Sequence, residues 1–251
     1  MTRSFGVLIW LEWKRLQTLA AILAVMVFLT VLIPIFFSPD RIELFGNLYG
    51  ARSAAMAAGL VLTLGLTVFS WARERRTGLF QMLLGSPASA AQLVLARFAG
   101  PAALLAVFLV VLNVATDAAL GHFFQAKAHL GLSALAMIYV SGITVFPICA
   151  WVLLGFIFVL TFRSSGVSLA AMLVFLGGSG TLGALIVELL NTISGRLAKL
   201  VIWPDFRLQP EQGWTCVVKV EQVYQEPLWV MLGVTLGCLV LSGVLWREVE
   251  V

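Results

Sequence analysis

The polar residues that could do chemistry in this chain are few, and most lie near the ends of apolar segments. Asn113, Thr116 and Asp117 are spaced at i, i+3 and i+4, so a helix would present them on one stripe. An ionisable group within a membrane is costly and often marks a functional position, so the stripe indicates a translocation path. Because Asp117 lies close to the end of its segment, a simple interfacial carboxylate is the alternative. Glu188, at the end of a later segment, is open to the same two interpretations.

Two histidines, His122 and His129, flank Lys127 in a short polar stretch. Their spacing of seven residues would place them on one face of a helix, where they could begin a metal or haem site. Without further ligands we interpret them as polar loop residues. The sequence contains no H-E-x-x-H, C-x-x-C or G-x-S-x-G motif. It therefore predicts no catalytic residue and no metal site.

Residues 73–87 combine a basic beginning, an apolar turn of helix and a Ser-Pro ending. Three arginines hold this stretch on the cytoplasmic side, and its apolar side chains are more than a solvated loop needs. We predict a docking element in which the apolar residues pack and the charged residues set orientation. Its residues are Arg73, Glu74, Arg75, Arg76, Gly78, Leu79, Phe80, Met82, Leu83, Ser86 and Pro87.

The elements that position these residues are apolar helices. The 251-residue chain is 61% hydrophobic and 11% charged, with a mean hydropathy of +1.03. This composition predicts one all-α integral membrane domain over residues 1–251. Six segments are long enough to cross the hydrocarbon: about 19–37, 54–72, 99–120, 131–162, 167–187 and 228–246. The fourth would extend about 46 Å, so we expect it to tilt, project or kink at Pro147.

Lysine and arginine predict the orientation of these helices. With the N-terminus in the cytoplasm, nine lie in short inner segments and three in short outer ones, so both termini are predicted inside. Arg41 and Arg52 then belong to an outer loop, and residues 73–97 form a cytoplasmic loop. The basic balance indicates contact with anionic lipid head groups rather than with nucleic acid.

Two further segments are predicted to lie along the membrane surface. Residues 1–18 have apolar side chains at helical spacing and predict an amphipathic interfacial helix, the alternative being a basic flank of the first span. Residues 188–227 form a large outer segment before the last span. Its first part, 189–203, is compatible with an amphipathic helix that ends at Pro204. We expect an interfacial or re-entrant element that could gate exit, or else an exposed linker.

The order of these parts and one loop motif resemble the permease subunits of ABC-2 type exporters. The motif is E-x-x-x-G-x-x-x-x-[LM]-L-x-S-P. This chain supplies it with Glu74, Gly78, Leu83, Leu84, Ser86 and Pro87. Residues 204–208 and 245–248 are also similar to what such permeases carry. The likeness covers nearly the whole chain in topology and about 25 positions in specific residues, with Leu79-Phe80 replacing the family's usual Thr-Glu.

The resemblance implies a six-span permease with both ends inside, in the inner membrane of a prokaryote. It implies two cytosolic ABC ATPase subunits as partners, a second permease copy or paralogue, and residues 73–87 as the coupling helix. The chain has no G-x-x-x-x-G-K-[ST] loop, so we expect no enzyme activity and no cofactor of its own, with ATP and Mg²⁺ bound by the partner. Export is expected because exporters dominate the family.

Three other classes compete with this interpretation. A haem-exporter-like permease of cytochrome c maturation shares the six spans and a Ser-Pro loop, but the long outer segment counts against it. A membrane scaffold that transports nothing could use the same basic hairpin to recruit a cytosolic partner. An intramembrane enzyme would need polar residues that converge at one depth, and the predicted spans contain neither a histidine pair nor paired carboxylates.

Overall fold

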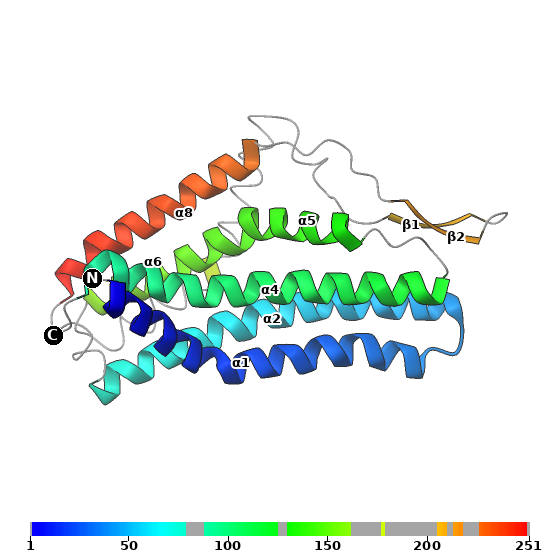
Figure 1. Cartoon of the computed structure of the whole chain (residues 1–251), viewed down its shortest axis with the longest axis horizontal. Coiled ribbons are helices and arrows are strands. Elements are labelled where there is room, and N and C mark those ends of the chain that lie inside the picture. Colours follow the sequence, from blue (N-terminus) through cyan, green and yellow to red (C-terminus); the bar gives the residue numbers. More distant parts are fainter. Residues whose placement is uncertain are drawn as a thin grey trace.

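Five long apolar helices dominate the part of the chain that the structure describes (Figure 1). The computed structural model describes residues 2–78, 88–124, 130–161, 177–178, 205–209, 213–217 and 226–249. By length and composition the five candidate spans are Gly6–Phe37, Glu43–Arg75, Ala90–Phe123, Ser133–Thr161 and Leu228–Glu248. Helices of this kind are typical of a multi-pass membrane protein.

Four of these five helices contain one of the six predicted segments, and the other, Ser133–Thr161, lies within the predicted segment 131–162. The remaining predicted segment, 167–187, lies outside the described residues apart from helical Gly177 and Gly178. The predicted interfacial helix over residues 1–18 is not a separate element, since α1 runs unbroken over Thr2–Phe37. No glycine or proline interrupts residues 7–33, so nothing local ends the helix at the membrane border. Figure 1 shows instead that the first part of α1 is inclined to the rest.

Helix α2 (Arg41–Thr77) begins well before the apolar run that predicted it. Its N-cap is Asp40, whose side chain accepts a 2.7 Å hydrogen bond from the backbone N–H of Glu43. It ends at Gly78, which has a φ of 76° and takes the left-handed conformation that glycine adopts most easily. The expectation that Arg52 belongs to an outer loop is therefore wrong. A charged residue stops an apolar run, but it does not stop a helix.

Helix α4 (Ala90–Phe124) packs along α1 and α2, and the chain then returns through α5 (Leu130–Val140), η1 (Ser141–Val145) and α6 (Phe146–Thr161). The kink expected at Pro147 takes the form of the π turn η1. The N–H of Phe146 bonds to the carbonyl of Ser141, five residues earlier. Because proline has no N–H to offer, the regular helical pattern cannot continue through residue 147.

The chain closes with α8 (Glu226–Leu245) and the short 3-10 turn η3 (Trp246–Glu248), and α8 packs mainly on α6. Before it, β1 (Asp205–Gln209) and β2 (Gly213–Val217) form an antiparallel hairpin in which Arg207 pairs with Thr215. The hairpin was not predicted, although polar and apolar residue types alternate over 205–209. The helix predicted over 189–203 lies outside the described residues.

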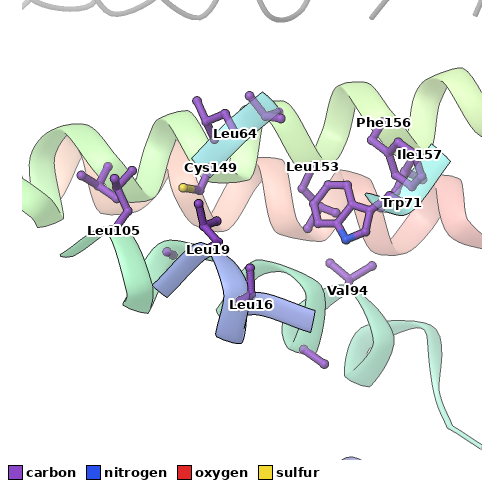
Figure 2. Close-up of a cluster of buried hydrophobic side chains, with 14 of the residues drawn as sticks. Leu16, Leu19, Leu64, Trp71, Val94, Leu105, Cys149, Leu153, Phe156 and Ile157 are labelled. Carbon is purple, nitrogen blue, oxygen red and sulfur yellow. The ribbon is translucent and has the colours of Figure 1, made fainter. Parts of the chain in front are cut away.

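The main core lies where α1, α2, α4 and α6 meet, close to the end of the bundle that holds both termini (Figures 1 and 2). The rings of Trp71 and Phe156 are 4.9 Å apart at its centre. Figure 2 labels Leu16, Leu19, Leu64, Trp71, Val94, Leu105, Cys149, Leu153, Phe156 and Ile157 from this cluster. This packing fixes the three helix ends that carry the charged residues described next.

Candidate functional site

Four charged side chains come together beside this core, and we call them the four-charge cluster: Glu12, Arg15, Glu74 and Arg97. Glu12 and Arg15 lie one turn apart on α1, Glu74 is in the last turn of α2, and Arg97 is in the second turn of α4. Core residues sit one helical turn away from each of them, so hydrophobic packing brings the charges together. Arg97 is only 2% exposed and Glu74 only 8%.

The cluster is a closed ring in which the charges alternate in sign. Arg97 Nη2 donates to Glu74 Oε2 at 2.5 Å, and Arg15 Nη1 donates to Glu12 Oε2 at 2.8 Å. Arg15 also pairs with Glu74, and Arg97 Nη1 lies 3.7 Å from Glu12 Oε1. Two bases and two acids give no net charge, which is what a buried ionic group requires. The ring therefore holds three helices together.

A cavity of about 240 Å³ adjoins the ring. Its wall is apolar and its charged part is the four-charge cluster itself. The residues that line it are Leu8, Leu11, Glu12, Arg15, Glu74, Leu93, Ala96 and Arg97. The Arg97 guanidinium also lies over the Trp71 ring, 5.6 Å from its centroid. Arg97 thus contacts the acids, the aromatic core and the cavity at once.

Only some of the predicted docking residues can be placed. Arg73 and Arg75 are exposed at the end of α2, and Gly78 ends that helix. Arg76 is helical, but its side chain lies outside the described part. So do the residues Leu79, Phe80, Met82, Leu83, Ser86 and Pro87.

Glu74 is placed differently from the role predicted for it. We expected it to help orient a docked partner, but its carboxylate is buried and bonded to α1 and α4. On a helix Glu74 is rotated by about 100° from Arg73 and Arg75. That rotation turns it toward the bundle while they remain exposed.

A second buried polar group, the Arg52 cluster, lies farther along α2 and α4 and consists of Arg52, Asn113, Asp117 and Ser133. Arg52 Nη1 donates to Asn113 Oδ1 at 3.1 Å and lies 3.6 Å from Asp117 Oδ1. Ser133, near the start of α5, donates its hydroxyl hydrogen bond to Asp117 Oδ2. The cluster therefore joins α2, α4 and α5.

The predicted stripe of Asn113, Thr116 and Asp117 does lie on one face of α4, and all three residues are buried. Thr116 bonds to the carbonyl of Leu112 at 2.8 Å within its own helix. Asp117 is buried and paired with Arg52, and whether it lies on a translocation path or at the membrane interface stays a prediction. A run of apolar residues in the sequence does not show that Asp117 of α4 pairs with Arg52 of α2.

The remaining candidate residues from the sequence are Glu188, His129 and His122. Glu188 and His129 lie outside the described residues. His122 is exposed in the last turn of α4, with its ring edge-on to Phe123 at 5.3 Å. Within the described ranges no three His, Cys, Asp or Glu side chains are grouped in a way that could hold a metal ion.

The two clusters mirror each other in sign. Helix α2 supplies the base, Arg52, to one cluster and an acid, Glu74, to the other, whereas α4 supplies Asp117 and Arg97. The spacing is about 33 Å along α2 and about 30 Å along α4, close to the thickness of the hydrocarbon. No charged residue lies within 53–72 or 98–116. The clusters are thus spaced to lie near the two borders of a membrane.

Comparison with protein-family models, with curated proteins and with solved structures found no match. The function of the chain is therefore inferred from its residues and their geometry.

Proposed function

We propose that this chain is the permease subunit of an ATP-binding cassette transporter, an exporter powered by two separate cytosolic ATPase subunits. A second copy of the chain, or a paralogue, would complete the pathway in the inner membrane of a prokaryote. ATP and Mg²⁺ would bind to the ATPase, since this sequence has no phosphate-binding loop. The five apolar helices support the membrane location.

The observation that carries the proposal is the four-charge cluster. Residues 79–87 connect α2 to α4, and the cluster bonds Glu74 at the end of α2 to Arg97 near the start of α4. Arg15 and Glu12 attach the same point to α1. A force on the connection would therefore displace three helices together instead of bending one. Coupling between an ATPase and a membrane pathway requires this mechanical property.

The surface that would meet the ATPase follows from the charges left exposed. Arg73 and Arg75 remain free of the buried ring and flank the connection. The apolar residues Leu79, Phe80, Met82 and Leu83 would pack into a groove of the ATPase, as amphipathic helices do in other complexes. Glu74 would act indirectly, by holding α2 on α1 and α4.

The test is purification of the tagged full-length chain from its native membrane. We expect an ABC ATPase to co-purify in stoichiometric amount, and the double variant Leu79→Asp/Phe80→Asp to lose it or to uncouple its ATP hydrolysis. The matched control is Leu79→Met/Phe80→Leu, which keeps an apolar surface and should keep the partner. Unchanged co-purification and coupling in the aspartate variant would contradict the proposal. Co-purification of a different cytosolic protein with the wild-type chain would favour the alternative that the protein is a membrane scaffold and transports nothing.

A further inference from the structure

The candidate span Ser133–Thr161 consists of two helical parts, α5 and α6, that are held by different neighbours. Helix α6 is enclosed by the main core and by α8, and most of its residues are buried. Helix α5 packs mainly on α4 (Figure 1). Within the described ranges its buried residues are Ser133, Ala136 and Met137. Because contacts between side chains hold helices together in a membrane, α5 is the less firmly held part.

The turn η1, which joins the two parts, has the chemistry of a hinge. Pro147 lies in the first turn of α6, where its missing N–H is not needed, but a regular helix could not run through it from α5. The hydroxyls of Ser141 and Thr144 each donate a 2.7 Å hydrogen bond to a carbonyl four residues earlier. Such bonds bend helices, and they satisfy carbonyls that the backbone would otherwise have to pair. A change of angle at η1 therefore disturbs fewer backbone hydrogen bonds than a bend elsewhere in the span.

Helix α8 supports this turn from one side. A Cβ added at Gly142 would lie 3.0 Å from Cδ1 of Leu228, in the first turn of α8. The absence of a side chain at Gly142 thus lets the turn lie close against α8. Ile143 of η1 and Met231 of α8 are buried in the same apolar contact. The contact fixes the position of η1, so that η1 can serve as a pivot.

The other end of α5 is attached to α4 by a polar contact. Ser133 donates a hydrogen bond to Asp117 Oδ2, and the other oxygen of this carboxylate lies 3.6 Å from Arg52 Nη1. Ser133 precedes Ser141 of the turn by about 12 Å along a helix. The contact lies toward the end of the bundle that is farther from the two termini (Figure 1). Helix α5 thus has an apolar pivot at one end and a hydrogen bond at the other.

We propose that α5 is a hinged arm, which swings about η1 and is latched onto α4 by the hydrogen bond from Ser133 to Asp117. With a lever of about 12 Å, a swing of about 30° moves Ser133 by roughly 6 Å, which breaks that bond. Met137 is fully buried but lies close to the pivot, so it moves much less. Its flexible side chain can adapt to the small shift.

The arm would control access to the polar stripe of α4. Asn113, Thr116 and Asp117 are at most 2% exposed, so a path along them is closed while α5 is latched. A swing of α5 would uncover Asp117, the residue of the stripe to which α5 is bonded. The use of α5 as a gate rests on the proposed transport function. The hinge and the latch do not depend on that function.

Distances between pairs of spin labels test the movement. The full chain, with its three native cysteines replaced by alanine, is placed in lipid nanodiscs and labelled at two introduced cysteines. One label stands at Phe37, which is 79% exposed at the end of α1. The second stands at Leu135 on α5, Val111 on α4 or Phe158 on α6, all of which are exposed. Double electron–electron resonance then gives the distribution of distances for each pair.

We expect the distances from Phe37 to Leu135 to fall into two populations, one latched and one open. Ser133→Ala removes the latch and should raise the ratio of open to latched protein about fivefold, the usual effect of one hydrogen bond. Ser133→Thr keeps a hydroxyl and should restore the original ratio. The control Thr116→Val removes a buried hydroxyl that is bonded within α4, and it should leave the ratio unchanged.

Pro147→Ala tests the pivot. It gives residue 147 a backbone N–H, so the turn stiffens, and in the Ser133→Ala background it should reduce the open population. Distances from Phe37 to Val111 and to Phe158 should stay the same in every variant, because α4 and α6 do not move.

Three results would overturn the proposal. They are unchanged Phe37 to Leu135 distances in Ser133→Ala, an open population that Pro147→Ala does not reduce, and a joint movement of the labels on α5 and α6. The measurement needs no ATPase. Its failure is therefore distinct from a failure of the ATPase to co-purify, which would count against the transport function.

Discussion

Replacing Arg97 by glutamine should destabilise the folded protein more than any change at the exposed arginines. Arg97 is 2% exposed, donates to Glu74 at 2.5 Å and faces Glu12 at 3.7 Å. Without it two buried carboxylates share the single base Arg15. At an effective dielectric constant near 20, two charges about 4 Å apart interact by roughly 4 kcal/mol. Removal of one partner from a buried pair costs about 3–5 kcal/mol, which agrees with this figure.

The assay is reversible unfolding in mixed micelles, in which the fraction of a denaturing detergent is raised and the fluorescence of the chain's eight tryptophans is followed. The expected loss lowers the ratio of folded to unfolded protein by roughly two to four orders of magnitude. Arg75→Gln, at the exposed end of α2, is the matched control and should have little effect.

A double-mutant cycle separates the pair from its surroundings. Glu74→Gln combined with Arg97→Gln should cost less than the sum of the two single changes, by about 1–3 kcal/mol, because the second change removes a charge that the first had left unpaired. Additive effects, or a cost for Arg97→Gln no larger than for Arg75→Gln, would refute the closed ring as a source of stability.

Two further predictions concern the contacts of α2 and α4 away from this ring. Gly59→Ala should destabilise by about 1–3 kcal/mol, because the new Cβ would lie 2.3 Å from Cε1 of the buried Phe108. Gly65→Ala meets no atom within 4 Å and should not destabilise, so equal effects in the micelle assay would contradict the close approach. Asp117→Asn should cost about 3 kcal/mol by leaving a buried guanidinium without its carboxylate, and Ser133→Ala only about 1 kcal/mol. Thermal denaturation in detergent compares the last two, and a larger loss for the serine variant would argue against the ion pair.

The membrane character and the approximate place of five helices could be predicted because the hydrocarbon sets a minimum apolar length that a sequence displays directly. The helix ends could not, since α2 continues to Arg41 beyond the apolar run where no hydrocarbon constrains it. Residue types also do not show which faces of distant helices meet. The sequence therefore predicts Arg97 in the loop 73–97 and Glu12 in the interfacial helix over residues 1–18. The sequence does show opposite charges near the same end of three spans. It does not show that these charges form a ring, because that depends on how the three helices pack.

The mirrored charges of α2 and α4 have a consequence for how the protein is made. During synthesis α2 leaves the ribosome first, and it carries Arg52, which the spacing of the clusters puts near a membrane border, with no acid beside it. Asp117 arrives only with α4, and an antiparallel arrangement of the two helices then neutralises both clusters together. A shift of α4 by one turn would separate both pairs at once. The paired charges are therefore expected to select the register in which α2 and α4 pack against each other in the bilayer.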